Sequence, residues 1–177
     1  MNAKELTISD GSGMELGTSG TGNSGAAMIS SDKVTLTGWS YINGDVKPSE
    51  VDDFEDYNDE WRLVTGNGPD IVFESKEIII NEWSNIDIKT ETAGNAGFLS
   101  IETDSLELRG ISNISSSSSK TGNGGYIVID TDDLLIEGLS QIETATMYRT
   151  SSSEEAIFMG GQGGNLTISA KNINMKM

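Results

Sequence analysis

The chain repeats itself at a regular interval, and this repeat constrains the fold more than any other feature. Residues 94–121 read GNAGFLSIETDSLELRGISNISSSSSKT, and the stretch from Gly122 reads GNGGYIVIDTDDLLIEGLSQIETAT, with the same residue types in the same places. Taking Ile101 as reference, Phe73 lies 28 residues earlier and Ile129 lies 28 residues later. Self-similarity on this scale is typical of solenoids and other stacked arrays.

Further copies align once two intervals are allowed to be longer. The interval from Ile29 to Phe73 is one of these and the interval from Ile129 to Ile168 is the other, so we predict insertions at residues 43–64 and 146–160. The copies then form five apolar columns, which we list in sequence order: Ala27, Ile71, Leu99, Ile127, Leu166; Ile29, Phe73, Ile101, Ile129, Ile168; Leu6, Val34, Ile78, Leu106, Leu134, Ile173; Ile8, Leu36, Ile80, Leu108, Ile136, Met175; Met14, Ile42, Ile86, Ile114, Ile142.

Within each copy the apolar residues alternate with polar ones between turns rich in Gly, Asn and Ser, which indicates strands. This pattern predicts about three short strands in each copy, and the strands of successive copies can stack in parallel. Parallel connections are almost always right-handed. We predict an all-β fold, a right-handed parallel β-helix with about 28 residues per rung, as a single domain over residues 1–177. The chain starts within one copy and stops within another, so we expect a segment of a longer solenoid, with end-to-end self-association possible.

Composition narrows the range of functions. The net charge of −17 makes nucleic acid and anionic membranes poor partners. The chain has neither cysteine nor histidine, which argues against disulfides, thiolate metal sites and histidine-based catalysis. No apolar run reaches the length that spans a membrane, and residues 1–4 do not resemble a signal peptide.

Two further columns carry the aromatic and hydroxyl side chains of the turns. Trp39 and Trp83 share a column with Ile111 and Leu139. Because two members are aliphatic, we expect an aromatic ladder in the core rather than a carbohydrate site. The next column is serine throughout, and we expect its stacked hydroxyls to bond along the axis: Ser12, Ser40, Ser84, Ser112, Ser140.

One outward column is acidic and consists of Glu74, Glu102 and Asp130, with Asp104 and Asp132 two residues further along their strands. Like charges on neighbouring strands repel unless they are screened or bridged. We expect an exposed acidic face that keeps the chain soluble; a bridging Ca²⁺ ion is the alternative. The predicted insertion 43–64 is also acidic, and both insertions are candidate contact sites.

At residues 163–170, GGNLTISA, and at residues 122–129, the chain resembles the filamentous haemagglutinin-like repeats of large bacterial exoproteins. That resemblance spans about residues 4–175. It implies a secreted or cell-surface shaft, often an adhesin exported by two-partner secretion, whose partners are glycans or proteins of a host or neighbouring cell.

We therefore expect a non-catalytic structural and interaction segment of an exported adhesin-like protein. We assign no catalytic, cofactor-binding or metal-binding residue. Two alternatives remain open. One is a polysaccharide-active or carbohydrate-binding β-helix protein, which needs paired carboxylates in a cleft. The other is a Ca²⁺-stabilised spacer that uses Glu74, Glu102 and Asp130.

Overall fold

The computed structural model describes residues 1–47, 65–119, 121–146 and 161–177. These residues form strands and turns without a helix, and hence without an apolar helix long enough to cross a bilayer. Every strand pair is parallel, so the predicted all-β class with parallel pairing is confirmed.

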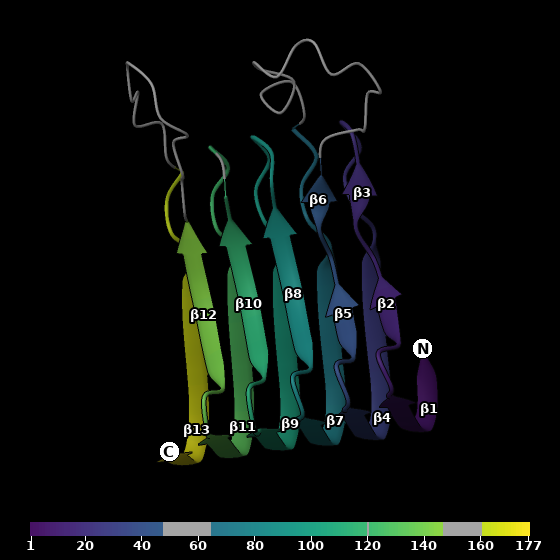
Figure 1. The fold of residues 1–177 in the computed structure, drawn as a ribbon, viewed down its shortest axis with the longest axis vertical. Helices are drawn as coiled ribbons and strands as arrows, with labels where there is room; N and C mark the ends of the chain where they lie inside the picture. Colours follow the sequence, from purple (N-terminus) through teal and green to yellow (C-terminus); the bar gives the residue numbers. More distant parts are fainter. Residues whose placement is uncertain (48–64, 120, 147–160) are drawn as a thin grey trace.

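The first sheet holds the long strands in the order β1-β4-β7-β9-β11-β13. Figure 1 shows them side by side from the N-terminus to the C-terminus. Their bounds are β1 Asn2–Ile8, β4 Ala26–Leu36, β7 Asp70–Ile80, β9 Phe98–Leu108, β11 Tyr126–Glu137 and β13 Asn165–Lys176.

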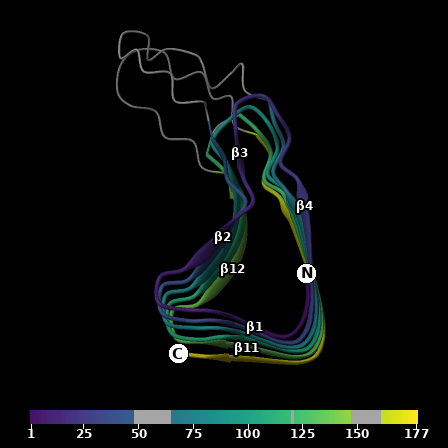
Figure 2. The ribbon, with the colours of Figure 1, turned by 90° about the vertical axis from the view of Figure 1, so that its right-hand side faces the viewer.

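The second sheet holds the shorter strands in the order β12-β10-β8-β5-β2, with β6 joining β8 to β3. Viewed along the stack, successive copies lie over one another, and the two sheets form separate walls (Figure 2). The bounds are β2 Gly13–Glu15, β3 Thr18–Ser19, β5 Tyr41–Asn43, β6 Val46–Lys47, β8 Asn85–Thr90, β10 Asn113–Ser118 and β12 Gln141–Thr146.

The pairing register follows the columns read from the sequence. Phe73 pairs with Ile101, and Ile101 pairs with Ile129, as the regular repeat predicts. The longer intervals also hold, because Ile29 pairs with Phe73 and Ile129 pairs with Ile168. A slip of one residue would turn every side chain to the opposite face, so the buried columns fix the register.

The apolar columns form one continuous core between the sheets. Phe73, Ile101 and Leu106 in its centre are at most 1% exposed. Toward β13 the same columns open to solvent, where Ile173 is 54% and Met175 is 70% exposed. The buried members include Ile29, Val34, Leu36, Ile42, Ile71, Ile78, Ile80, Ile86, Ile88, Leu99, Leu108, Ile114, Ile127, Ile129 and Leu134.

The prediction of three short strands per copy is wrong in one respect, because the first two form a single bent strand. In β9, for example, Leu99–Ile101 and Leu106–Leu108 belong to one continuous element. At the bend the Thr103 hydroxyl donates to the carbonyl of Ser105, 3.1 Å away. Ser75 and Thr131 make the equivalent bonds in β7 and β11. These short side chain–backbone bonds support the bend and leave the ladder largely paired.

The turns that open each copy are joined by an amide ladder. In each case the backbone N–H of one copy donates to the side-chain oxygen of the copy before it. The distances lie between 2.8 and 3.2 Å. The residues are Asn23, Asn67, Asn95, Asn123 and Gln162.

The first residues of both predicted insertions belong to strands of the second sheet. Asn43 ends β5, and Val46 and Lys47 form β6, so the first part of the 43–64 stretch belongs to the second sheet. Thr146 ends β12. Residues 48–64 and 147–160, the remainder of both predicted insertions, lie outside the described residues.

Candidate functional site

The predicted acidic column exists as a row of neighbouring residues in the first sheet. Glu74 pairs with Glu102, and Glu102 pairs with Asp130. All three side chains are exposed. Together with Asp104 and Asp132 they line a shallow hollow of about 460 Å³. Strand spacing places successive carboxylates about 4.8 Å apart, so this face repels anions.

Charges at the bend are compensated by ion pairs along the stack. The Lys76 ammonium lies 2.6 Å from Asp32, and the Lys171 ammonium lies 2.7 Å from Asp132. Each pair holds the pKa of its lysine above the usual value, chiefly through the hydrogen bond to the carboxylate. Lys76 occupies the same position of the repeat as Asp104, yet its ion pair is with Asp32.

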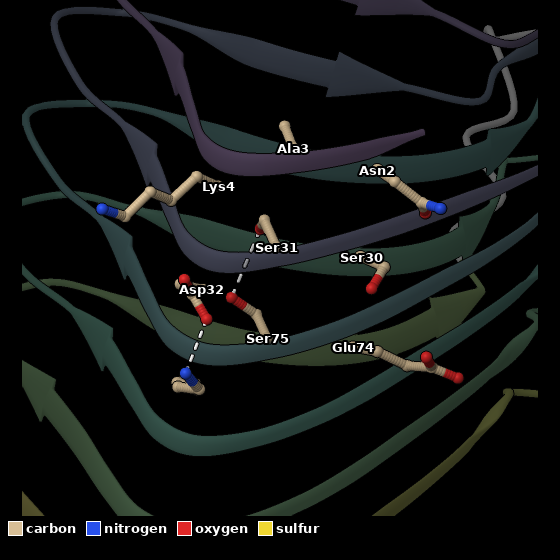
Figure 3. A pocket seen from close by; sticks show the side chains of 9 residues that line it. Asn2, Ala3, Lys4, Ser30, Ser31, Asp32, Glu74 and Ser75 are labelled. Atoms are coloured by element: carbon tan, nitrogen blue, oxygen red, sulfur yellow. Dashed lines mark hydrogen bonds and ion pairs between the residues drawn. The ribbon is translucent and has the colours of Figure 1, made fainter.

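Around the Lys76–Asp32 pair lies a second shallow hollow of about 670 Å³ (Figure 3). Its lining mixes charges of both signs with hydroxyls, and Ser31 and Ser75 lie 3.5 Å apart at its base. Exposed ion pairs such as Lys76–Asp32 contribute little to stability. Within the described ranges no three acidic side chains approach closely enough to hold a metal ion. The geometry of the acidic column therefore gives the calcium alternative no support.

The tryptophan column lies on the surface, so the prediction of an aromatic core ladder is wrong. Trp39 is 64% exposed and Trp83 is 50% exposed. Their rings are stacked, with centroids 4.9 Å apart and an angle of 3° between the planes. Ile111 and Leu139 continue the column and are 36% and 73% exposed. We call these four side chains the indole platform.

Both tryptophans of the platform have an unusual backbone conformation. Trp39 has φ 67° and Trp83 has φ 66°, values in the left-handed region that bulky residues rarely adopt. Gly11, the corresponding residue one copy earlier, has φ 74°. Beneath the turns the serine column is buried at Ser40 and Ser84. Its hydroxyls bond to backbone groups rather than to each other, as when Ser84 Oγ accepts from the N–H of Ser40 at 3.2 Å.

Polar groups border the platform. The Thr37 hydroxyl donates to Glu82 Oε2 at 2.8 Å. Thr37 lies two residues before Trp39 in the sequence, and Glu82 directly precedes Trp83. Arg109 forms an ion pair with Glu107 at 2.8 Å and a second pair with Glu137, one copy further along the stack. The hydrogen bond to Glu107, which outweighs the effect of burial, raises the pKa of Arg109. The platform thus combines apolar surface with a rim that is mainly acidic.

A buried polar cluster on the second sheet was missed by the sequence analysis. Asp87 is only 4% exposed. Its carboxylate accepts hydrogen bonds from Asn85, from Lys89 at 2.8 Å, from Asn113 at 3.2 Å and from Ser115. The available signal was the alternating polar sequence of β8, read against β10 at an offset of one copy.

Burial and neighbouring charges shift the pKa values of two groups in this cluster, Lys89 and Asp45. Burial opposes the ammonium of Lys89, but its hydrogen bond to Asp87 and the nearby carboxylates outweigh burial, so the pKa of Lys89 is raised. Burial raises the pKa of Asp45, against the opposing effect of Lys47 at 3.6 Å. Asn43 Oδ1, Asp45 Oδ1 and Asn113 Oδ1 accept no hydrogen bond from the described residues. The cluster orders the outer face of this sheet.

Comparison with family models, with curated proteins and with solved structures finds no match to this chain. The assignment of function therefore depends on the geometry of the chain itself. That geometry offers an acidic column, a compensated polar cluster and an exposed aromatic platform. Each can bind a ligand or a partner, and the platform is the most unusual of the three.

Proposed function

We propose that this chain is a segment of a right-handed parallel β-helix that serves as a non-catalytic scaffold for contacts at a cell surface. Each rung has about 28 residues, the separation of the hydrogen-bonded turn residues Asn67 and Asn95. The observation that carries the proposal is the unbroken register of the apolar columns through both sheets. The side chains of the inward columns form the core and must stay apolar, whereas the side chains of the outward columns can differ between copies without loss of the core. Solenoids form extended binding surfaces in this way.

The proposal includes export. The repeats resemble those of filamentous haemagglutinin-like exoproteins, and this resemblance supports a location outside the cell or on its surface, facing glycans or proteins of a host or neighbouring cell. Protease added to intact cells that carry the natural gene tests this location. We expect cleavage without lysis; protection until the cells are lysed would contradict export.

A scaffold has no turnover. The chain should be incubated with acidic and neutral polysaccharides, and new reducing ends should be measured. We expect none. Reducing ends that appear with the chain and vanish in a Glu74→Gln or Glu102→Gln variant would replace this proposal with a polysaccharide-active enzyme.

We also propose end-to-end association through β13, whose edge carries exposed apolar side chains. Ile173 and Met175 occupy columns that are buried elsewhere. A further strand laid against this edge would cover them and pair its open backbone groups. Sedimentation velocity over a range of concentrations should reveal larger species, which Ile173→Lys should suppress. A monomer at every concentration would contradict this part of the proposal.

A further inference from the structure

We infer that the indole platform binds an uncharged glycan, and that a sugar ring stacks on the open face of Trp39. This inference rests on the proposed function and deepens it, because it names the chemical class of partner that the scaffold contacts. Four features of the platform support it: exposure, an open ring face, a strained backbone and an acidic rim.

The first feature is exposure. Trp39 and Trp83 keep half or more of their surface in water, while the serines that follow them, Ser40 and Ser84, are buried. An aromatic side chain gains a large free energy from burial. Contiguous exposed apolar surface bordered by polar residues is typical of interaction sites. The platform continues over Ile111 and Leu139 along the stack, with neighbouring side chains about 4.8 Å apart.

The second feature is an open ring face. Trp83 covers one face of Trp39. On the opposite side the corresponding residue is Gly11, since Gly13 pairs with Tyr41 at the same offset. Gly11 has no side chain, and a Cβ added there would meet no heavy atom within 4 Å. The structure therefore leaves space for a flat ligand over the indole of Trp39.

The third feature is backbone strain. Asp10, Trp39, Glu82 and Trp83 are the non-glycine residues with φ in the left-handed region among those the structure describes. Trp39, Glu82 and Trp83 lie in the turns of the two indoles, and Asp10 lies in the preceding turn, next to Gly11. Such conformations cost free energy and cluster at ligand sites, where function retains them. Because glycine occupies the same place at Gly11, a bulky indole is not required by the turn itself.

The fourth feature is the acidic rim. Asp10 lies in the turn of Gly11, beside the open face, and Glu82 lies in the turn of Trp83, on the other side of Trp39. Each already accepts one hydroxyl: Asp10 accepts from Ser9, and Glu82 accepts from Thr37 in the strand that leads to Trp39. A carboxylate has capacity for further donors. A pyranose presents C–H groups on its face and hydroxyl donors around its edge. It can therefore stack on the indole while its hydroxyls bond to these carboxylates.

Charge decides between classes of partner. The chain carries a net charge of −17, and Arg109, two residues before Ile111, is already paired with Glu107 and Glu137. An acidic polysaccharide would be repelled. A second copy of the chain carries the same net charge of −17 and would also be repelled at the platform. A neutral glycan supplies the donors and carries no opposing charge.

The test uses the full chain with insoluble cellulose, chitin and β-1,3-glucan, and with polygalacturonate as the acidic arm. Depletion of the chain from solution is measured, followed by titration with soluble oligosaccharides and indole fluorescence. We expect binding to at least one neutral glycan and none to polygalacturonate. Trp39→Gly should weaken binding about tenfold or more, and Trp83→Ala should weaken it less.

Matched controls separate binding from folding. Trp39→Gly restores the residue type of Gly11 in the same turn, so its thermal unfolding should remain cooperative, close to that of the parent chain. Tyr126→Ala removes another exposed aromatic side chain, which lies in β11 of the first sheet and outside the platform, and should leave binding unchanged. Retained binding in Trp39→Gly, binding to polygalacturonate alone, or binding to no neutral glycan would overturn the inference. Self-association abolished by Trp39→Gly would identify a second copy as the occupant instead.

The two proposals fail separately. If no neutral glycan binds while the turnover, export and sedimentation tests give the expected results, only the platform inference falls. If reducing ends appear and depend on Glu74 or Glu102, the scaffold falls whether or not Trp39 contributes to binding.

Discussion

Ser115 donates a hydrogen bond to Asp87 from the neighbouring strand of the second sheet, although the two residues belong to different copies of the repeat. Both side chains are almost completely buried. With Asn85, Lys89 and Asn113, Ser115 supplies donors to both carboxylate oxygens of Asp87. A buried carboxylate is tolerated only when it is compensated in this way.

Asp87→Asn should therefore destabilise the fold. The substitution removes the charge that four donors address and turns an amide N–H₂ toward some of them. We expect a loss of about 3 kcal/mol in the free energy of unfolding, measured by urea denaturation. Asp130→Asn, in an exposed carboxylate, should change stability by about 0.5 kcal/mol or less. Equal effects of the two substitutions would show that the cluster does not stabilise the sheet.

Asp45 gives a prediction for pH. Burial raises the pKa of Asp45, so the folded chain binds this proton more tightly than the unfolded chain does. The stabilising effect is full below the ordinary value of 3.8 and is lost as the pH rises through the raised pKa. Asp45→Asn, which cannot ionise, should therefore unfold at a higher urea concentration than the parent chain at pH 7. The difference in urea midpoint between the two proteins should shrink as the pH falls, and it should vanish near the ordinary pKa value of 3.8. A difference that does not change with pH would contradict the assignment.

The acidic column predicts that a charge reversal is favourable. Glu102 lies between Glu74 and Asp130 on adjacent strands. Glu102→Lys replaces two repulsions with two attractions and should stabilise the fold by about 0.2–1 kcal/mol at low salt. The gain should fall at high salt, because exposed charges are screened. Ser100→Lys adds the same side chain between Val72 and Val128, and it serves as the control. Glu102→Lys changes the net charge by two and Ser100→Lys by one, so a gain from Ser100→Lys half that of Glu102→Lys or larger would indicate an effect of net charge alone.

Close backbone packing gives a fourth prediction. A Cβ on Gly122 would lie 1.7 Å from the carbonyl oxygen of Gly94, which is backbone and cannot move aside cheaply. Gly122→Ala should cost about 1–3 kcal/mol by thermal or urea unfolding. A Cβ on Gly163 would meet nothing within 4 Å, so Gly163→Ala should be neutral or slightly stabilising. A stable Gly122→Ala variant would mean that the turns are less tightly stacked than described.

The sequence predicted the strand register well because the core columns carry a strong apolar pattern. Ile101 and Leu106 must face the interior in every copy, and a slipped register would expose them. The columns at the turns carry no such information. Trp39 is a large apolar residue, yet it lies in a turn with a left-handed backbone and its indole is exposed.

The Asp87 cluster was missed for a different reason. Each donor to Asp87 is an ordinary polar residue, and the cluster becomes visible only when β8 and β10 are laid side by side. Lys76 likewise pairs with Asp32. A long side chain can reach either of the two neighbouring strands, and local geometry determines which one it contacts. Periodicity gives the height of a residue in the stack, but it does not give the partner of its side chain.

The register has a consequence for the outer surface as a whole. Ser100, Val72 and Val128 lie in one row, so a side chain moved by one copy along the sequence keeps its direction and shifts by about one strand spacing of 4.8 Å. The two longer intervals still connect adjacent strands, so extra residues between copies do not alter the spacing. Single substitutions on the outer face can therefore place chemical groups at intervals of one strand spacing along the stack, and the core beneath stays unchanged.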